Sequence, residues 1–114
     1  LSSKARYGIA SKELKNIEGV TTIQHNPECE SSRHLYQIRV KNRDKVMEYL
    51  NTHKIYPGVH YKDNTQYELY KKGYGTCPNA HKISNELITL PIHCNLQDED
   101  CYFVIKTLKQ ALCQ

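Results

Sequence analysis

The chain has 114 residues and a formal net charge of +4, with 39% of its residues hydrophobic and 25% charged. This length fits one domain, and the composition excludes an intrinsically disordered chain and a membrane protein, which needs apolar runs of roughly 20 residues. The basic residues are spread along the chain, so we expect neither nucleic acid nor a membrane as a partner. The N-terminus has no signal-peptide core, and we therefore expect a cytoplasmic protein.

The first part of the chain predicts a helix, a strand, a loop and a second strand. In residues 3–17 the apolar side chains fall broadly on one side of a helix, and Gly19 supplies a stop just beyond it. The β-branched residues 20–24 predict a short strand, and the polar, proline-containing residues 25–33 predict a loop. Residues 34–40 alternate between polar and apolar, which predicts a strand with one face more buried.

A second helix and an interrupted strand are predicted next. Asn42 is a suitable N-cap for a helix over residues 43–53, whose apolar residues form a stripe. Residues 54–61, KIYPGVHY, predict a strand that is interrupted at Pro57 and Gly58. Because proline cannot donate a hydrogen bond to a central ladder, this segment is an edge, a bulge or a strand start.

The last part of the chain predicts three helices and a strand. Residues 63–75 predict one short helix that ends at Gly73. Residues 78–87 predict another helix, opened by a proline and with apolar residues at i, i+3 and i+7. Residues 88–93 predict a short strand, and residues 98–112 predict the clearest helix, with acidic residues in its first turn. Together these elements predict an α/β (α+β) two-layer sandwich, a small sheet covered by helices.

The cysteines favour free thiols over a disulfide framework. There are five, an odd number, with no Cys-x-x-Cys pair. Cys77 and His81 lie one helical turn apart, and His93 and Cys94 add two possible ligands, but the spacing matches no zinc motif, so we expect no metal. A cysteine–histidine nucleophilic pair stays open, because such partners need not be close in sequence.

Tyrosine dominates the aromatic residues. The chain has nine tyrosines, one phenylalanine and no tryptophan, and five of the tyrosines lie between positions 56 and 74. Because tyrosine has an apolar ring and a polar tip, this cluster predicts a half-buried surface, either a ligand wall or an interface. A polar-rimmed core is the alternative. The sequence contains no phosphate-binding loop, HExxH or GxSxG motif, so the residues alone predict a small α/β domain with a surface rich in tyrosine and histidine.

Three segments of the chain, HLYQIRV followed by NRD, then PGVHY, then LPIHCNLQDED, lie in that order over about residues 33–108. Together they resemble the C-terminal small domain of the DegT/DnrJ/StrS family of pyridoxal-phosphate (PLP)-dependent sugar aminotransferases. The resemblance implies a small, mostly antiparallel sheet covered by helices, as in the small domain of fold-type I aminotransferases. It also implies that residues 1–17 form a linking helix from a large domain and that residues 18–114 form the small domain.

The resemblance further implies an enzyme that transfers an amino group from glutamate to a nucleotide-linked keto sugar in polysaccharide biosynthesis. In this family a lysine of the large domain holds PLP. We therefore expect no catalytic and no cofactor-binding residue in this chain, an inactive isolated segment, and a homodimer for the full enzyme. Two alternatives stay open: a stand-alone binding or interaction module derived from this domain, and a nucleic-acid reader, for which HLYQIRV offers only Tyr36.

The resemblance also gives PGVHY a role, because its counterpart in the family faces the cleft between the domains. The Pro-Gly break then turns the chain so that an imidazole and a phenol reach the substrate. We expect four substrate-binding residues, namely His60, Tyr61, Asn64 and His34. For His34, at the start of a strand, the alternative is a purely local backbone contact.

The chain departs from the family pattern in two places. KDNTQYELY follows the loop where many members have Pro-x-x-x-His, so the residues that contact the substrate here need not be those of the family pattern. Gln97 stands where Ser or Thr usually opens the last helix, so we expect Asp98 to cap that helix instead.

Overall fold

The computed structural model describes residues 3–32, 34–93 and 95–113. Its elements are α1 (Ser3–Leu14), β1 (Val20–Thr22), β2 (Tyr36–Val40), α2 (Arg43–Thr52), the 3₁₀ helices η1 (Asn64–Gln66) and η2 (Glu68–Gly73), α3 (Pro78–Ser84), β3 (Leu87–Leu90) and α4 (Asp98–Leu112). Within the described residues, no helix is both long and apolar enough to cross a membrane.

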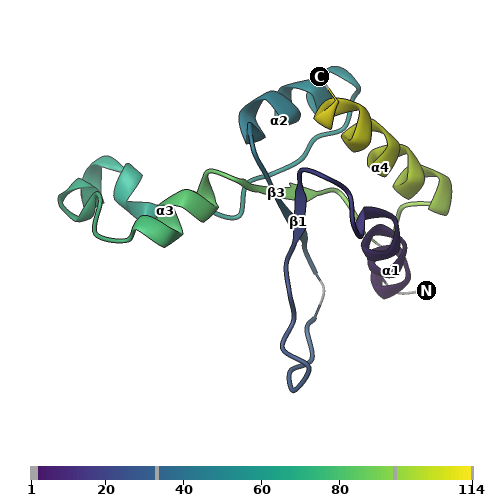
Figure 1. Ribbon diagram of the computed structural model, residues 1–114, viewed down its shortest axis with the longest axis horizontal. Coiled ribbons are helices and arrows are strands. Elements are labelled where there is room, and N and C mark those ends of the chain that lie inside the picture. The colour runs from purple at the N-terminus through teal and green to yellow at the C-terminus, as the bar shows by residue number, and fades with distance from the viewer. Residues whose placement is uncertain (1–2, 33, 94, 114) are drawn as a thin grey trace.

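The three strands form one antiparallel sheet in the order β1-β2-β3 (Figure 1). The central strand β2 alternates as its sequence predicts, because its first, third and fifth residues are buried and its second and fourth are only partly buried. Residues directly opposite each other on antiparallel strands share a face. Ile38 and its partner Ile88 therefore lie on the buried face, and Gln37 and its partner Thr89 lie on the other, which we call the polar face.

Three helices cover the buried face of the sheet. Both α1 and α2 pack on α4, whose predicted apolar stripe is buried and joins one core with the strands. The largest fully buried side chains of this core include Leu14 of α1, Leu50 of α2 and Leu108 of α4. Burial of one such side chain contributes about 1.5–3 kcal/mol to folding. The predicted two-layer α+β sandwich is confirmed.

Helix ends depart from prediction where the backbone turns left-handed. Helix α1 ends at Leu14, before the predicted Ile17, because Asn16 has a φ of 63°. Asn42 precedes α2 as expected, but at φ 55° its side chain makes no capping hydrogen bond, since a capping residue needs an extended backbone. Asp98 does not cap α4: Gln97 is the N-cap, and its backbone N–H donates to Asp100 Oδ2 at 3.1 Å.

The stretch 54–61 is not a strand. Only Gly58 pairs with the sheet, in an isolated antiparallel bridge to Thr89, a residue of β3. Proline at 57 has no N–H to extend the pairing, and Lys54 has a φ of 63°. The single helix predicted over 63–75 is instead η1 and η2, because Tyr67 between them is extended.

Residues 59–86, which we call the arm, extend away from the sheet and its three helices (Figure 1). His60 and Glu86, near the two ends of the arm, still contact the sheet. The arm contributes no residue to the core, and Ser84 is its one buried residue. The apolar stripe predicted for α3 is wrong, because Ala80 and Ile83 are exposed and Leu87 belongs to β3. The five clustered tyrosines are 48–73% exposed, so the alternative of a polar-rimmed core is wrong. They are Tyr56, Tyr61, Tyr67, Tyr70 and Tyr74.

Candidate functional site

His60 lies against the polar face of the sheet. Gly58 and Thr89 exchange two backbone hydrogen bonds, of 3.0 and 2.8 Å, and these hold the start of the arm beside β3. The imidazole of His60 folds back over Gly58, and a Cβ at position 58 would lie 2.9 Å from its Cε1. Glycine at position 58 therefore leaves room for the His60 ring, which a Cβ there would displace.

Two side chains of the polar face hold His60. Nδ1 of the ring lies 2.8 Å from Thr89 Oγ1, and Gln37 Nε2 donates to the backbone carbonyl of His60. Gln37 Nε2 also lies 3.5 Å from Thr89 Oγ1. In the part of the chain that the structure describes, the other ring nitrogen, Nε2, makes no hydrogen bond. His60 therefore has one fixed edge and one edge available to a ligand.

His60 borders a groove of about 270 Å³ together with His34, Tyr56 and His93. The structure thus brings together two of the four predicted site residues, His34 and His60, although they come from different segments. His34 is exposed, and its Nδ1 lies 3.0 Å from the Ser32 hydroxyl, so its local partner is a side chain rather than the backbone. Three imidazoles and one phenol give the groove several donors and acceptors for a polar ligand.

Tyr61 and Asn64 do not line this groove. The Tyr61 ring meets the His60 ring edge to face, with 4.9 Å between centroids, and the Tyr61 residue is 73% exposed. Asn64 is exposed at the start of η1. Both residues therefore lie on the arm beyond His60, on a surface separate from the groove.

A polar cluster within the arm ties its helices together. The Asp63 carboxylate accepts hydrogen bonds from the backbone N–H and the hydroxyl of Thr65, at 3.0 and 2.8 Å, and its Oδ2 lies 3.1 Å from His81 Nδ1. The Thr65 N–H, then its hydroxyl and then His81 lower the pKa of Asp63 below its usual value. His81 thus links α3 to η1 and is not paired with Cys77 in a metal site. Among the described residues, no three metal-ligating side chains come together.

The described cysteines carry free thiols, and Cys94 lies outside the described residues. Cys101 is buried in the core, and this burial, followed by nearby Asp98, raises the pKa of its thiol. A thiol in this setting is inert and serves packing.

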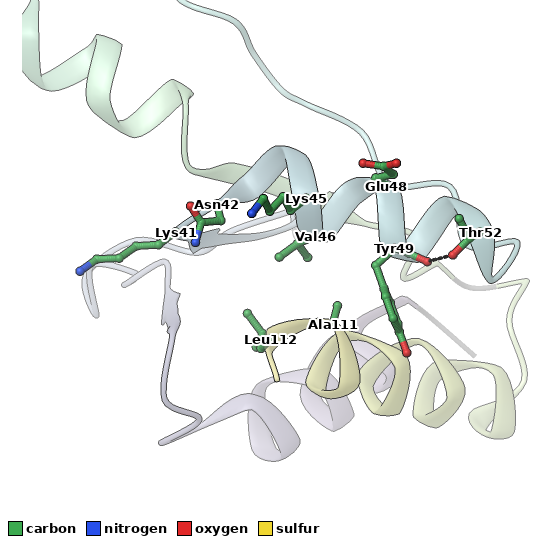
Figure 2. A pocket seen from close by; sticks show the side chains of 9 residues that line it. All are labelled: Lys41, Asn42, Lys45, Val46, Glu48, Tyr49, Thr52, Ala111 and Leu112. Atoms are coloured by element: carbon green, nitrogen blue, oxygen red, sulfur yellow. Dashed lines mark hydrogen bonds between the residues drawn. The ribbon is translucent and has the colours of Figure 1, made fainter. Parts of the chain in front are cut away.

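A second cavity, of about 420 Å³, lies between α2 and α4 and contains none of the predicted site residues (Figure 2). Val46 and Tyr49 of α2 point toward Ala111 and Leu112 of α4 across it. These are side chains of the packed helices. The cavity therefore lies along the contact between these two helices, and we place the candidate site at His60.

Sequence reasoning missed Thr89 and Gln37, although both hold His60. Thr89 is a polar residue in an apolar strand, and this is the one signal that marked it. Gln37 is an ordinary polar position of an alternating strand, and its role depends on the register that sets it opposite Thr89.

A model of the DegT/DnrJ/EryC1/StrS aminotransferase family matches residues 2–109. The chain belongs to this family. Two proteins similar in sequence and one solved structure illustrate how much of the chain is similar to known proteins.

The sequence is 31% identical over 101 residues to the erythromycin biosynthesis sensory transduction protein EryC1 of Saccharopolyspora erythraea, covering 85% of this chain and 28% of that protein. It is 33% identical over 90 residues to the UDP-4-amino-4,6-dideoxy-N-acetyl-β-L-altrosamine transaminase of Helicobacter pylori, covering 69% of this chain and 24% of that protein. The chain therefore spans less than a third of the length of these relatives.

The fold matches the PLP form of Spr1654 from Streptococcus pneumoniae, with a TM-score of 0.86 and 29% identity over 96% of this chain and 30% of that one. Together with the antiparallel sheet and its helix layer, this likeness confirms the small-domain fold of the DegT/DnrJ/EryC1/StrS aminotransferases.

Proposed function

We propose that this chain is the C-terminal small domain of a PLP-dependent sugar aminotransferase that transfers an amino group from glutamate to a nucleotide-linked keto sugar. Residues 18–114 form the domain, and residues 1–17, whose helix α1 packs in the same core, form its link to a large domain. The family match supports the proposal, as does the chain's share of its relatives, 28% of EryC1 and 24% of the Helicobacter pylori transaminase. The complete enzyme is proposed to be a cytoplasmic homodimer.

The chain's own part in this function is to bind the nucleotide-linked sugar at the His60 groove. The observation that carries this role is the fixed imidazole of His60, which is held by Thr89 and leaves Nε2 without a partner among the described residues. Imidazole and phenol groups hydrogen-bond sugar hydroxyls and phosphate oxygens. Tyr61 and Asn64, on the adjoining arm, are proposed to extend the contact beyond the groove.

The groove does not suit PLP itself. PLP requires a lysine for its Schiff base and a protein group beside its pyridine nitrogen. The described residues that line the groove include neither a lysine nor a carboxylate. PLP is thus assigned to the part of the protein outside this chain, and this domain is proposed to be inactive alone.

The intact mass of the native protein, taken from its source cells with an antibody to this domain, tests the domain assignment. A mass several times that of this 13.3-kDa chain supports an aminotransferase with a large domain. A mass equal to that of the chain contradicts the proposal and leaves the stand-alone binding module in its place.

The substitution His60→Ala in the full enzyme tests the site. Loss of one hydrogen bond to an anionic or polar ligand is expected to raise the KM for the nucleotide-linked sugar about tenfold. The half-reaction with glutamate, which needs no sugar, should stay at the wild-type rate. The matched control is His53→Ala, because His53 is an exposed histidine at the end of α2. An unchanged KM, or equal losses in both half-reactions, would refute the sugar contact.

A further inference from the structure

Gln37 and Thr89 form a cross-strand pair directly beneath His60. They are register partners on β2 and β3, so their side chains lie next to each other on the polar face. Thr89 is 7% exposed, and its hydroxyl therefore depends on protein partners for its hydrogen bonds. The contacts that join the three residues form a closed ring, from the His60 carbonyl through Gln37 and Thr89 back to the His60 imidazole.

The direction of the hydrogen bonds in this ring starts at the backbone carbonyl of His60. A carbonyl oxygen only accepts, so the Gln37 amide must present its nitrogen to it, which settles the orientation of the amide. The same nitrogen carries a second hydrogen, and Thr89 Oγ1 lies 3.5 Å away to accept it. The hydroxyl of Thr89 is then an acceptor toward Gln37 and keeps its own hydrogen for another partner.

That hydrogen has one acceptor among the described residues, His60 Nδ1, which lies 2.8 Å from Thr89 Oγ1. In the opposite arrangement Nδ1 would carry a hydrogen and donate to Thr89, and the buried hydroxyl hydrogen would have no acceptor among the described residues. An unsatisfied buried polar group costs about 1–3 kcal/mol. The ring is fully satisfied only when the Thr89 hydroxyl donates to Nδ1.

We infer that Gln37 and Thr89 are positioning residues that hold His60 in the tautomer with its hydrogen on Nε2, so that His60 donates a hydrogen bond to an acceptor oxygen of the ligand. The identity of that ligand rests on the proposed function. The tautomer follows from the hydrogen bonds of this chain alone. An Nε2–H donor selects for phosphate, carbonyl or hydroxyl oxygens and against a protonated amine at the same position.

Nitrogen-15 NMR of the histidine rings in the protein, at about pH 8 where an ordinary imidazole is neutral, tests the tautomer directly. We expect the His60 resonances of a protonated Nε2 and an unprotonated Nδ1. Thr89→Ser should keep this pattern because it keeps the hydroxyl, and Thr89→Val should shift it toward a mixture of tautomers. His53, whose Nδ1 lies 2.9 Å from the Tyr49 carbonyl, is the internal control and should not change in either variant.

The wild-type spectrum is decisive even if Thr89→Val does not fold. A hydrogen on His60 Nδ1 in the wild-type protein would overturn the inference. A His60 spectrum that is the same in folded Thr89→Val as in the wild type would also overturn it.

Kinetics of the full enzyme then identify the acceptor oxygen. Thr89→Val should raise the KM for the nucleotide-linked sugar about three- to tenfold with little change in kcat, and Thr89→Ser should restore it. Uridine diphosphate and deoxythymidine diphosphate serve as inhibitors without a sugar. Weaker inhibition in Thr89→Val assigns the acceptor to the diphosphate, and unchanged inhibition with a raised KM assigns it to the sugar. If the tautomer is as inferred and neither constant changes, the proposed function fails and the positioning of His60 stands.

Discussion

The substitution Gly58→Ala should displace the His60 ring while leaving the global stability nearly unchanged. The added Cβ would lie 2.9 Å from Cε1, so the ring must withdraw by at least about 0.5 Å to reach the shortest ordinary contact of 3.4 Å. This movement weakens the 2.8 Å contact with Thr89, and a hydrogen bond of this kind contributes about 0.5–1.5 kcal/mol. Alanine also lowers the conformational entropy of the unfolded chain, which raises the unfolding free energy by about 0.4–1 kcal/mol. The net change in unfolding free energy should therefore stay within about 1 kcal/mol.

The assay pairs urea denaturation with NMR of the histidine rings. The midpoint of unfolding reports the global effect, and the ring resonances report the local one. We expect the His60 signals to shift and those of His25 and His53 to stay in place. In the full enzyme, the same variant should raise the KM for the nucleotide-linked sugar by a factor similar to that of His60→Ala.

Gly8→Ala is the matched control for this substitution. Gly8 lies within α1, where an added Cβ meets nothing within 4 Å, so the variant should gain up to about 1 kcal/mol of stability from helix propensity. Its His60 signals should be those of the wild type. Unchanged His60 signals in Gly58→Ala would show that the ring does not pack on Gly58, and the reasoning from the close approach would be wrong.

Two further predictions concern the core and the arm. Leu108→Ala in α4 removes a side chain that is 0% exposed and should lower the unfolding free energy, measured by urea titration, by about 2.7–5 kcal/mol. Phe103→Ala, at a half-exposed position of the same helix, should lower it much less. Equal losses in the two variants would contradict the assigned core. The pKa of Asp63 is lower in the folded chain than its unfolded value of about 3.9. The stability that the ionised carboxylate gives the arm is therefore complete above the unfolded pKa and is lost as the pH falls through the lower, folded pKa. The protection factors of arm amides against hydrogen exchange should therefore fall in acid in the wild type, and Asp63→Asn should remove this dependence. Protection factors with the same acid response in both proteins would contradict the prediction.

The sheet and its helix layer could be predicted because their patterns are long or strictly alternating. The stripe of α4 runs from Cys101 to Ala111, about three turns, and β2 alternates over its whole length, so burial follows from the sequence directly. Residues 54–61 show where the local pattern is not enough. Their aromatic and β-branched composition is typical of a strand, but a strand needs a neighbour, and here only Gly58 finds one. Local composition carries no information about that neighbour.

The candidate site could be predicted only in part for the same reason. The resemblance pointed to His60 and His34, and the structure places both at one groove. It could not point to Gln37, because the link from Gln37 to His60 depends on a register between strands that are far apart in sequence. Nor could it separate Tyr61 and Asn64 from the groove, since the path of the arm is set by contacts such as Asp63 to His81.

The closure of the arm at its base divides the chain into a core that needs particular apolar residues and an arm that does not. The Gly58–Thr89 bridge joins the start of the arm to β3, and Leu87 begins that strand, so both ends of the arm are fixed at the sheet. Near these ends His60 also contacts Thr89, and Glu86 pairs with Arg39 of β2. Each doubling of a loop's length costs about 0.6 kcal/mol of closure entropy, and no arm residue belongs to the core. Changes of length or residue type between these ends, away from His60, Ser84 and Glu86, should therefore cost the sheet and its helix layer little stability. Residues 62–70, KDNTQYELY, lie wholly inside the arm and outside the core, so substitutions there should cost folding little.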